Sequence, residues 1–168
     1  MREPSGQWLD LLQEAGCSRS VIRHCMTVRD AVLGYDKRSF AETGLLEAGA
    51  LLHDIGRGIT HGIAHAQAGA MYCRRRGLPE AVARIVECHL GAGLTADECT
   101  LLRLLPIDCI PRTIEEKMVA NADNLVAGER IIHIEERMMR SFHLPRHLKK
   151  RLFHLWLEME IIRRSPIK

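Results

Sequence analysis

The chain has 168 residues, of which 46% are hydrophobic and 27% are charged, and this profile indicates one soluble globular domain. Only 4% of the residues are aromatic, so the core must be aliphatic, and the residues that supply it are mostly good helix formers. No stretch approaches the roughly 18 apolar residues needed to span a bilayer, and the N-terminus has no apolar run of signal-peptide length. We therefore expect a cytoplasmic protein without a membrane partner.

Glycine, proline and capping residues divide the chain into helical segments. In chain order, the expected helices cover about 8–16, 18–34, 44–54, 61–76, 79–90, a short stretch after Thr95, 113–127, 129–142 and 145–164. Thr95 with Glu98, and Thr113 with Glu116, each fit a capping box. No segment shows the sustained alternation that is typical of a strand. The sequence predicts an all-α, single-domain helical bundle over 1–168.

The formal net charge of +3 is unevenly distributed along this bundle. From Arg137 to Lys168 there are nine Lys or Arg residues and two Glu residues, a net charge of +7, which leaves −4 for the rest of the chain. We therefore distinguish a motif-bearing part at about 18–130 from basic C-terminal helices at about 131–168. Such asymmetry can mark an anionic partner, and it equally fits a solvated helix face.

The six cysteines do not form a C-x-x-C pair, and most of them lie in apolar helical contexts. Buried, reduced thiols in a cytoplasmic protein are the expected state. The cysteines are Cys17, Cys25, Cys73, Cys88, Cys99 and Cys109.

The dipeptide His53-Asp54 is the first candidate for chemistry. It follows the apolar run 48–52, at the end of a helix that breaks into Gly56-Arg57-Gly58. Adjacent helical residues point about 100° apart, but at a helix end the backbone can turn both side chains toward one point. An imidazole and a carboxylate there offer a nitrogen and an oxygen to one divalent ion.

Four more residues strengthen this hypothesis, because each lies near the apolar face of its helix. An unpartnered carboxylate in the nearly uncharged stretch 118–126 would cost several kcal/mol, whereas a shared metal centre satisfies all of these side chains at once. They are His24, His65, His89 and Asp123.

Together these motifs resemble the H…HD…D signature of the HD superfamily of metal-dependent phosphohydrolases. The matching residues are His24, the HDIG tetrapeptide His53-Asp54-Ile55-Gly56, the H-x-x-x-G-A element at 65–70, His89, Glu116-Lys117 and Asp123. The pattern is also similar to the diadenosine tetraphosphate hydrolases of this superfamily and to archaeal HD proteins without an assigned activity. The Gly-Tyr-Pro of the HD-GYP class does not follow the HDIG, which disfavours cyclic di-GMP hydrolysis.

The resemblance implies an HD-type helical bundle around one or two divalent transition metal ions, of manganese, iron, nickel, cobalt or zinc. It implies His24, His53, Asp54 and Asp123 as the primary ligands. Members with two further histidines bind a second ion, and these map onto His65 and His89, with Asp54 as the bridge.

The expected activity is hydrolysis of a phosphorylated small molecule, most simply a nucleotide, by metal-activated water, with Asp54 as the catalytic residue that orients the water or accepts its proton. Arg57 and Lys117 are candidate donors to phosphate oxygens, with a surface salt bridge as the alternative for each. His61, at i−4 from His65, is a candidate for substrate contact, with helix capping or direct ligation as alternatives.

Two other classes of function stay open. One is a regulatory HD module that binds a nucleotide without turnover. The other is an adaptor for RNA that uses the basic C-terminal segment. Its aromatic residues are sparse, however, and the spacing of Leu152, Leu155, Trp156 and Met159 favours a core stripe over a base-stacking surface.

Overall fold

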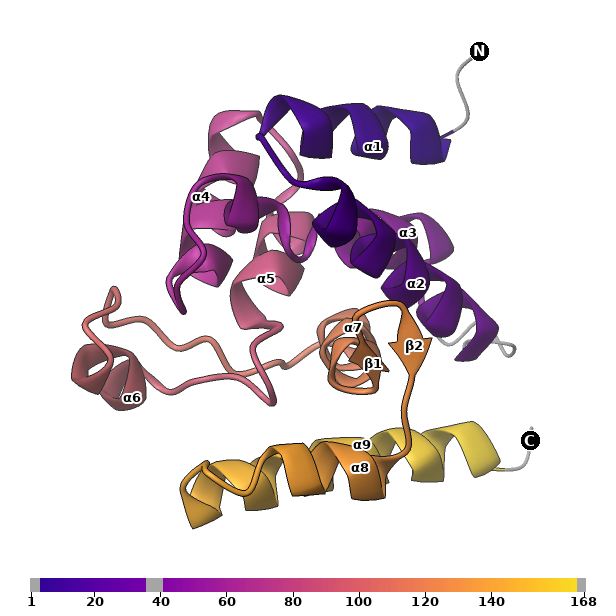
Figure 1. Ribbon diagram of the computed structural model, residues 1–168, viewed down its shortest axis with the longest axis vertical. Coiled ribbons are helices and arrows are strands. Elements are labelled where there is room, and N and C mark those ends of the chain that lie inside the picture. The colour runs from indigo at the N-terminus through magenta and orange to yellow at the C-terminus, as the bar shows by residue number, and fades with distance from the viewer. Residues whose placement is uncertain (1–3, 36–40, 166–168) are drawn as a thin grey trace.

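Helices dominate the computed structural model, which describes residues 4–35 and 41–165 (Figure 1). The all-α prediction is therefore confirmed. The helices are α1 (Pro4–Glu14), α2 (Arg19–Tyr35), α3 (Thr43–Leu52), the short 3-10 helix η1 (Ile55–Gly58), α4 (His65–Arg75), α5 (Glu80–Cys88), α6 (Ala96–Leu101), α7 (Ile114–Asn124), α8 (Ile134–Arg140) and α9 (Arg146–Arg164). The two-residue strands β1 (Val126–Ala127) and β2 (Arg130–Ile131) form an antiparallel pair.

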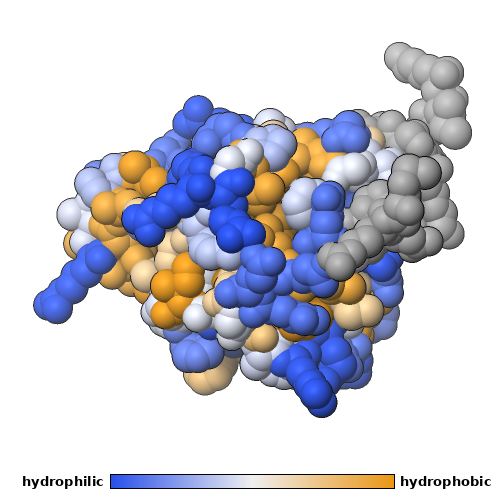
Figure 2. Space-filling view, turned by 90° about the horizontal axis from the view of Figure 1, so that it is seen from above, coloured by the Kyte–Doolittle hydropathy of each residue, from blue (hydrophilic) through white to orange (hydrophobic). Residues whose placement is uncertain are grey.

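The helices are arranged around α7 (Figure 1). Above it, one apolar cluster joins α1 to the four helices α2 to α5, with Leu12, Leu52 and Val86 among its fully buried members. A second cluster joins α2, α3 and α7 to α9, which forms a separate lower layer together with α8. Helix α6 lies to one side, between long loops. The outer face seen from above is mainly polar, with apolar patches between the charged side chains (Figure 2).

The apolar stripes seen in the sequence are the faces that pack. Cys25, Val28 and Val32 of α2 are all fully buried, at spacings that place them on one side of the helix. On α9, Leu152, Leu155 and Met159 are buried and Trp156 is half-buried. The interpretation of this stripe as core is confirmed. At roughly 2 kcal/mol for each large aliphatic side chain, this burial is what attaches α9 to α7.

The helix predicted over 129–142 is wrong in its first part. Residues 126–131 form the β1–β2 hairpin, and α8 begins only at Ile134. Gly128 has φ +65° at the first of the two turn residues, the pattern of a type II′ turn, which matches the twist of the strands it connects. Strands of two residues are too short to show an alternating pattern of apolar and polar residues, so the sequence did not predict this hairpin.

Two other boundaries also differ. Helix α4 begins at His65, because residues 59–64 form a turn, and α3 ends at Leu52 and is followed by η1. The capping box of Thr95 and Glu98 is present in full. At Thr113 half of the expected box forms: Thr113 accepts a hydrogen bond from the Glu116 amide, but the Glu116 carboxylate accepts from the amide of Arg112.

All six cysteines are free, as expected, and all but the half-buried Cys17 are buried. Within 4–35 and 41–165, no helix combines the length and the apolar character needed to cross a membrane.

Glu98 connects α6 to α9, and its carboxylate provides a test of this packing. It accepts a hydrogen bond from the Thr95 amide and pairs with both terminal nitrogens of Arg151 on α9, at 2.8 and 2.9 Å. The Arg151 guanidinium lowers the pKa of Glu98 to about 2. A lowered folded-state pKa stabilises the fold above the unfolded pKa of about 4.5, and this contribution is lost as the pH falls toward 2.

We expect Glu98→Gln to lower the free energy of unfolding by about 1–2 kcal/mol at pH 7, because it removes a charge-assisted pair. At pH 2 the variant and the wild type should be nearly equal. Urea denaturation at both pH values measures this. An equal deficit at both pH values would show that Glu98 contributes through packing rather than through its charge.

Candidate metal centre

Five helical elements supply the predicted ligands. His24 lies on α2, His65 begins α4, His89 directly follows α5, and Asp123 lies near the end of α7. His53 and Asp54 follow α3, and their backbone angles explain how two adjacent side chains can point toward the same cluster. His53 is still helical, with φ −53° and ψ −38°, whereas Asp54 leaves the helix, with φ −98° and ψ 12°. The change of backbone direction turns both side chains inward.

Gly56 brings the start of α4 against η1. A Cβ atom at this position would overlap the carbonyl oxygen of His65 and would lie 2.7 Å from the amide nitrogen of Gly69. A Cβ at Gly69 would in turn lie 2.9 Å from the amide of Gly56. The glycines of the HDIG and H-x-x-x-G-A motifs are therefore the two sides of one backbone contact, which places His65 beside Asp54.

Each of the four histidines is anchored through its Nδ1 atom to a main-chain carbonyl. The acceptors are Gly128 for His24 (2.8 Å), Ala50 for His53 (2.8 Å), Gly62 for His65 (2.9 Å) and Val86 for His89 (2.7 Å). A carbonyl oxygen can only accept, so every Nδ1 carries a proton. In the neutral imidazole, Nε2 is then the atom with the lone pair, which is the tautomer of a metal ligand.

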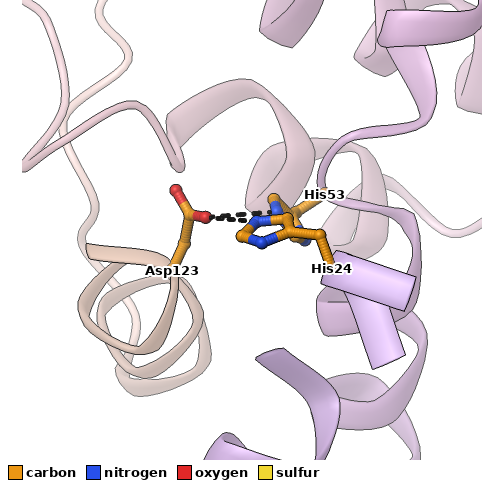
Figure 3. A group of neighbouring side chains, drawn as sticks. All are labelled: His24, His53 and Asp123. Atoms are coloured by element: carbon orange, nitrogen blue, oxygen red, sulfur yellow. Dashed lines mark hydrogen bonds and ion pairs between the residues drawn. The ribbon is translucent and has the colours of Figure 1, made fainter. Parts of the chain in front are cut away.

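The first group of ligand atoms comes from α2, α3 and α7. The Nε2 atoms of His24 and His53 lie 2.9 and 3.4 Å from the same oxygen, Oδ1 of Asp123. Both imidazoles point at this carboxylate (Figure 3). His53 is fully buried, while the Asp123 side chain is 22% exposed, so the group lies at the edge of the protein interior. These three residues could hold a metal ion.

The second group surrounds Asp54. Its Oδ1 lies 3.0 Å from Nε2 of His65 and 3.5 Å from Nε2 of His89, and its Oδ2 lies 3.9 Å from Nε2 of His53. His53, Asp54 and His89 form a second set that could hold a metal ion, so His53 is shared by both groups. All three are buried.

The donor set fits a divalent cation. Nε2 of His65 and Nε2 of His89 lie 3.1 Å apart, and two facing lone pairs repel unless a proton or a cation lies with them. Two atoms bound to one ion at about 2.1 Å lie about 3.0–3.4 Å apart. Nε2 of His53 and Oδ1 of Asp54 are also buried without a hydrogen-bond partner in the described part of the chain. A metal ion supplies the partner that such groups require.

The charges of the cluster favour ionised carboxylates. Burial alone would raise the pKa of Asp54, but His53, His65 and His89 outweigh it and hold the pKa well below its usual range. His24 and His53 do the same for Asp123. Burial opposes a proton on His24, yet the hydrogen bond to Asp123 raises its pKa above the ordinary value. Such a proton is what a bound cation displaces.

The three predicted substrate residues are placed differently. Arg57 joins the cluster, because its Nε donates to Oδ2 of Asp54 at 2.7 Å. His61 is exposed in the turn before α4, next to Gly62, the residue that anchors His65. Lys117 pairs with Glu158 of α9 at 2.6 Å, on a different face of α7 from Asp123. This placement does not support a substrate contact for Lys117.

Sequence reasoning missed one cation near the ligands. Arg137 of α8 donates from Nη2 to Oδ1 of Asn124, at 2.9 Å, and Asn124 directly follows Asp123. No motif contains Arg137, and its place in a basic segment gave the sequence no reason to separate it from its neighbours.

A groove of about 780 Å³ lies elsewhere, between α2, α7 and α9. Tyr35, Asn121 and Trp156 are among its lining residues, and none of the six predicted ligands is. The candidate site is therefore identified by its chemistry and not by its volume.

Comparison with known proteins agrees with this geometry. The sequence model of the HD domain matches residues 21–128. An uncharacterised protein of Methanocaldococcus jannaschii is 42% identical over 125 residues, which cover 71% of this chain and 74% of that protein. The HD domain of the phosphodiesterase PgpH of L. monocytogenes, solved with cyclic-di-AMP, shares the fold, with a TM-score of 0.59 and 14% identity over 96% of this chain and 99% of that one.

Two further relatives are larger. Proteins named tRNA (cytidine(56)-2'-O)-methyltransferase, from Thermoplasma volcanium and Picrophilus torridus, are 44% and 42% identical to this chain over 76% and 79% of its length. The chain spans only 38% and 39% of the length of these two proteins.

The backbone contact at Gly56 gives a test of how the ligands are held. We expect Gly56→Ala to lower the free energy of unfolding by about 1–3 kcal/mol, because the added methyl group must separate η1 from α4. The same displacement should reduce the manganese retained after dialysis. Gly34→Ala on α2 is the matched control, since Gly34 is exposed and a Cβ there would meet no atom within 4 Å. Full metal retention by the Gly56 variant would contradict the assigned role of this contact.

Proposed function

The chain belongs to the HD-domain family, and from this we propose that it is a metal-dependent phosphohydrolase that acts on a nucleotide or a related phosphoester. The observation that carries the proposal is the set of four histidines whose Nδ1 atoms are all occupied by carbonyls, while their Nε2 atoms converge with Asp54 and Asp123. Buried imidazoles and carboxylates in this arrangement serve ligation better than packing.

Asp54 and Arg57 have different roles in the proposed reaction. When bound, a divalent cation lowers the pKa of a water molecule and offsets the negative charge of a phosphoryl group. Asp54 belongs to the second candidate group, and its ionised carboxylate can orient that water or accept its proton. Arg57 holds Asp54 through Nε, and its partly exposed guanidinium has further donors for a phosphate oxygen.

The substrate class is proposed from chemistry and supported by the neighbours. PgpH is named a phosphodiesterase, and its HD domain was solved with a cyclic dinucleotide. The likeness is one of fold, so a screen should include cyclic dinucleotides, dinucleoside polyphosphates and nucleoside phosphates alike. The metal is one or two ions of manganese, iron, nickel, cobalt or zinc, all of which accept mixed nitrogen and oxygen ligands.

Binding of RNA is the second candidate, and a specific observation favours it. Two relatives in which the matching stretch forms about two-fifths of the protein are named tRNA methyltransferases. The exposed Arg146 and Lys150 belong to the basic segment. If RNA is the partner, affinity for tRNA should fall steeply with salt, and replacing both residues with Glu should weaken it. If tRNA does not bind, or binds with an affinity that does not depend on salt, the RNA candidate is contradicted and the phosphohydrolase proposal stands alone.

The catalytic proposal predicts that the protein hydrolyses at least one phosphoester on such a screen when it is loaded with manganese. Asp54→Ala should then lower turnover by at least about a hundred-fold, because it removes both a ligand and a water-orienting carboxylate. Circular dichroism should show unchanged helix content. The measurement is release of phosphate or nucleotide with each divalent metal in turn.

Asp30→Ala is the matched control for this experiment, since Asp30 is an exposed carboxylate on α2, the helix that carries His24. Activity that survives Asp54→Ala would mean a contaminating phosphatase or a wrong site. If the fully loaded wild type turns over no substrate, the regulatory module becomes the better interpretation.

A further inference from the structure

Arg137 lies near the edge of the metal centre, and no carboxylate in the described part of the chain pairs with it. Its Nη2 donates to Asn124, whose own Nδ2 donates to the carbonyl of Gly91 at 2.6 Å. Asn124 thus connects α8 to the loop that follows His89, and it lies beside Asp123. Among the described residues, Arg137 has no carboxylate within 4.0 Å, whereas Arg130 and Arg140, near it in the chain, both pair with Glu136.

Among the described residues, the remaining donors of Arg137 have no hydrogen-bond partner. Its Nε is buried and makes no hydrogen bond within the described chain, although a guanidinium has five N–H groups to satisfy. Leaving such a donor buried and unpaired costs about 1–3 kcal/mol. Burial lowers the pKa of Arg137, and the negative charge of Asp123, which lies beyond salt-bridge distance, partly compensates for this. This compensation disappears when Asp123 binds a cation.

An anion resolves this conflict. With a cation on Asp123, the centre and Arg137 carry like charges near the same carboxylate. A phosphoryl group placed between them gains from both, because one oxygen can face the cation while another accepts from the guanidinium. Arg57 already provides a cation on the Asp54 side of the cluster.

We propose that Arg137 binds a phosphate oxygen of the substrate at the Asp123 end of the cluster, whereas Arg57 contacts Asp54. This inference rests on the proposed function and adds to it a residue from α8, outside the region 21–128 that the family model matches. The basic C-terminal segment then contributes one specific cation to the site. The hydrogen bond to Asn124 sets the position of that cation.

The test measures phosphate and metal separately. Manganese-loaded protein, freed of unbound metal, is titrated with inorganic phosphate, and binding is followed through the broadening of the phosphorus resonance by the bound manganese. We expect Arg137→Gln to weaken phosphate binding by about ten- to a hundred-fold, the effect of losing a charged hydrogen bond. Manganese content and helix content should be unchanged. Arg137→Lys keeps the positive charge but loses the planar guanidinium. Its phosphate affinity should lie between those of the wild type and Arg137→Gln.

Arg140→Gln is the matched control, since it removes the same charge from the same helix, where Arg140 is 52% exposed and bound to Glu136. It should bind phosphate like the wild type. Phosphate binding by Arg137→Gln at wild-type strength would overturn the inference alone and leave the phosphohydrolase intact. A loss of manganese in that variant would also overturn it, because Arg137 would then act by positioning Asp123. No phosphate binding and no turnover in the wild type would overturn both proposals.

Discussion

The hydrogen bonds between imidazole Nδ1 atoms and main-chain carbonyls are the constraint on which the site depends. Each carbonyl belongs to a helix end or a turn, namely Ala50 and Val86 one turn before their histidines, Gly62 before α4, and Gly128 in the hairpin. Carbonyls at helix ends have no intrahelical partner and are free to accept. The fold therefore fixes the ring orientations with groups that it must satisfy in any case, and directs four lone pairs inward.

The candidate ligands could be selected from the sequence because they share one property. Each is a polar residue on an apolar face, and only a common centre accounts for all of them. The two motif glycines could be recognised, but their contact with each other could not, since it depends on how η1 meets α4. The apolar stripe of α9 was also predictable, because the spacing of apolar residues identifies the face of a helix that packs against the protein.

The contacts of Lys117 and Arg137 depend on more than spacing along the chain. Six residues separate Lys117 from Asp123, a rotation that places them about 120° apart around α7, and Lys117 forms the salt bridge that was its alternative. Arg137 lies 13 residues beyond Asn124, and the β1–β2 hairpin reverses the chain so that the two residues come into contact. Strands of two residues are too short to give a periodic signal. A contact that depends on a turn of this kind cannot be obtained from spacing alone, because the turn sets the direction of the returning helix.

The positions of the ligands along the chain have a consequence for folding. His24 and Asp123 are 99 residues apart, and the other ligands lie between them on elements that pack around α7. A cation bound by these residues is a cross-link that closes loops of tens of residues, and it restricts the unfolded chain much as a disulfide would. Six free thiols form no such link in this protein. The ion would therefore determine how cooperatively the upper helices and α7 come apart, and metal availability would set the lifetime of the folded chain as well as its chemistry.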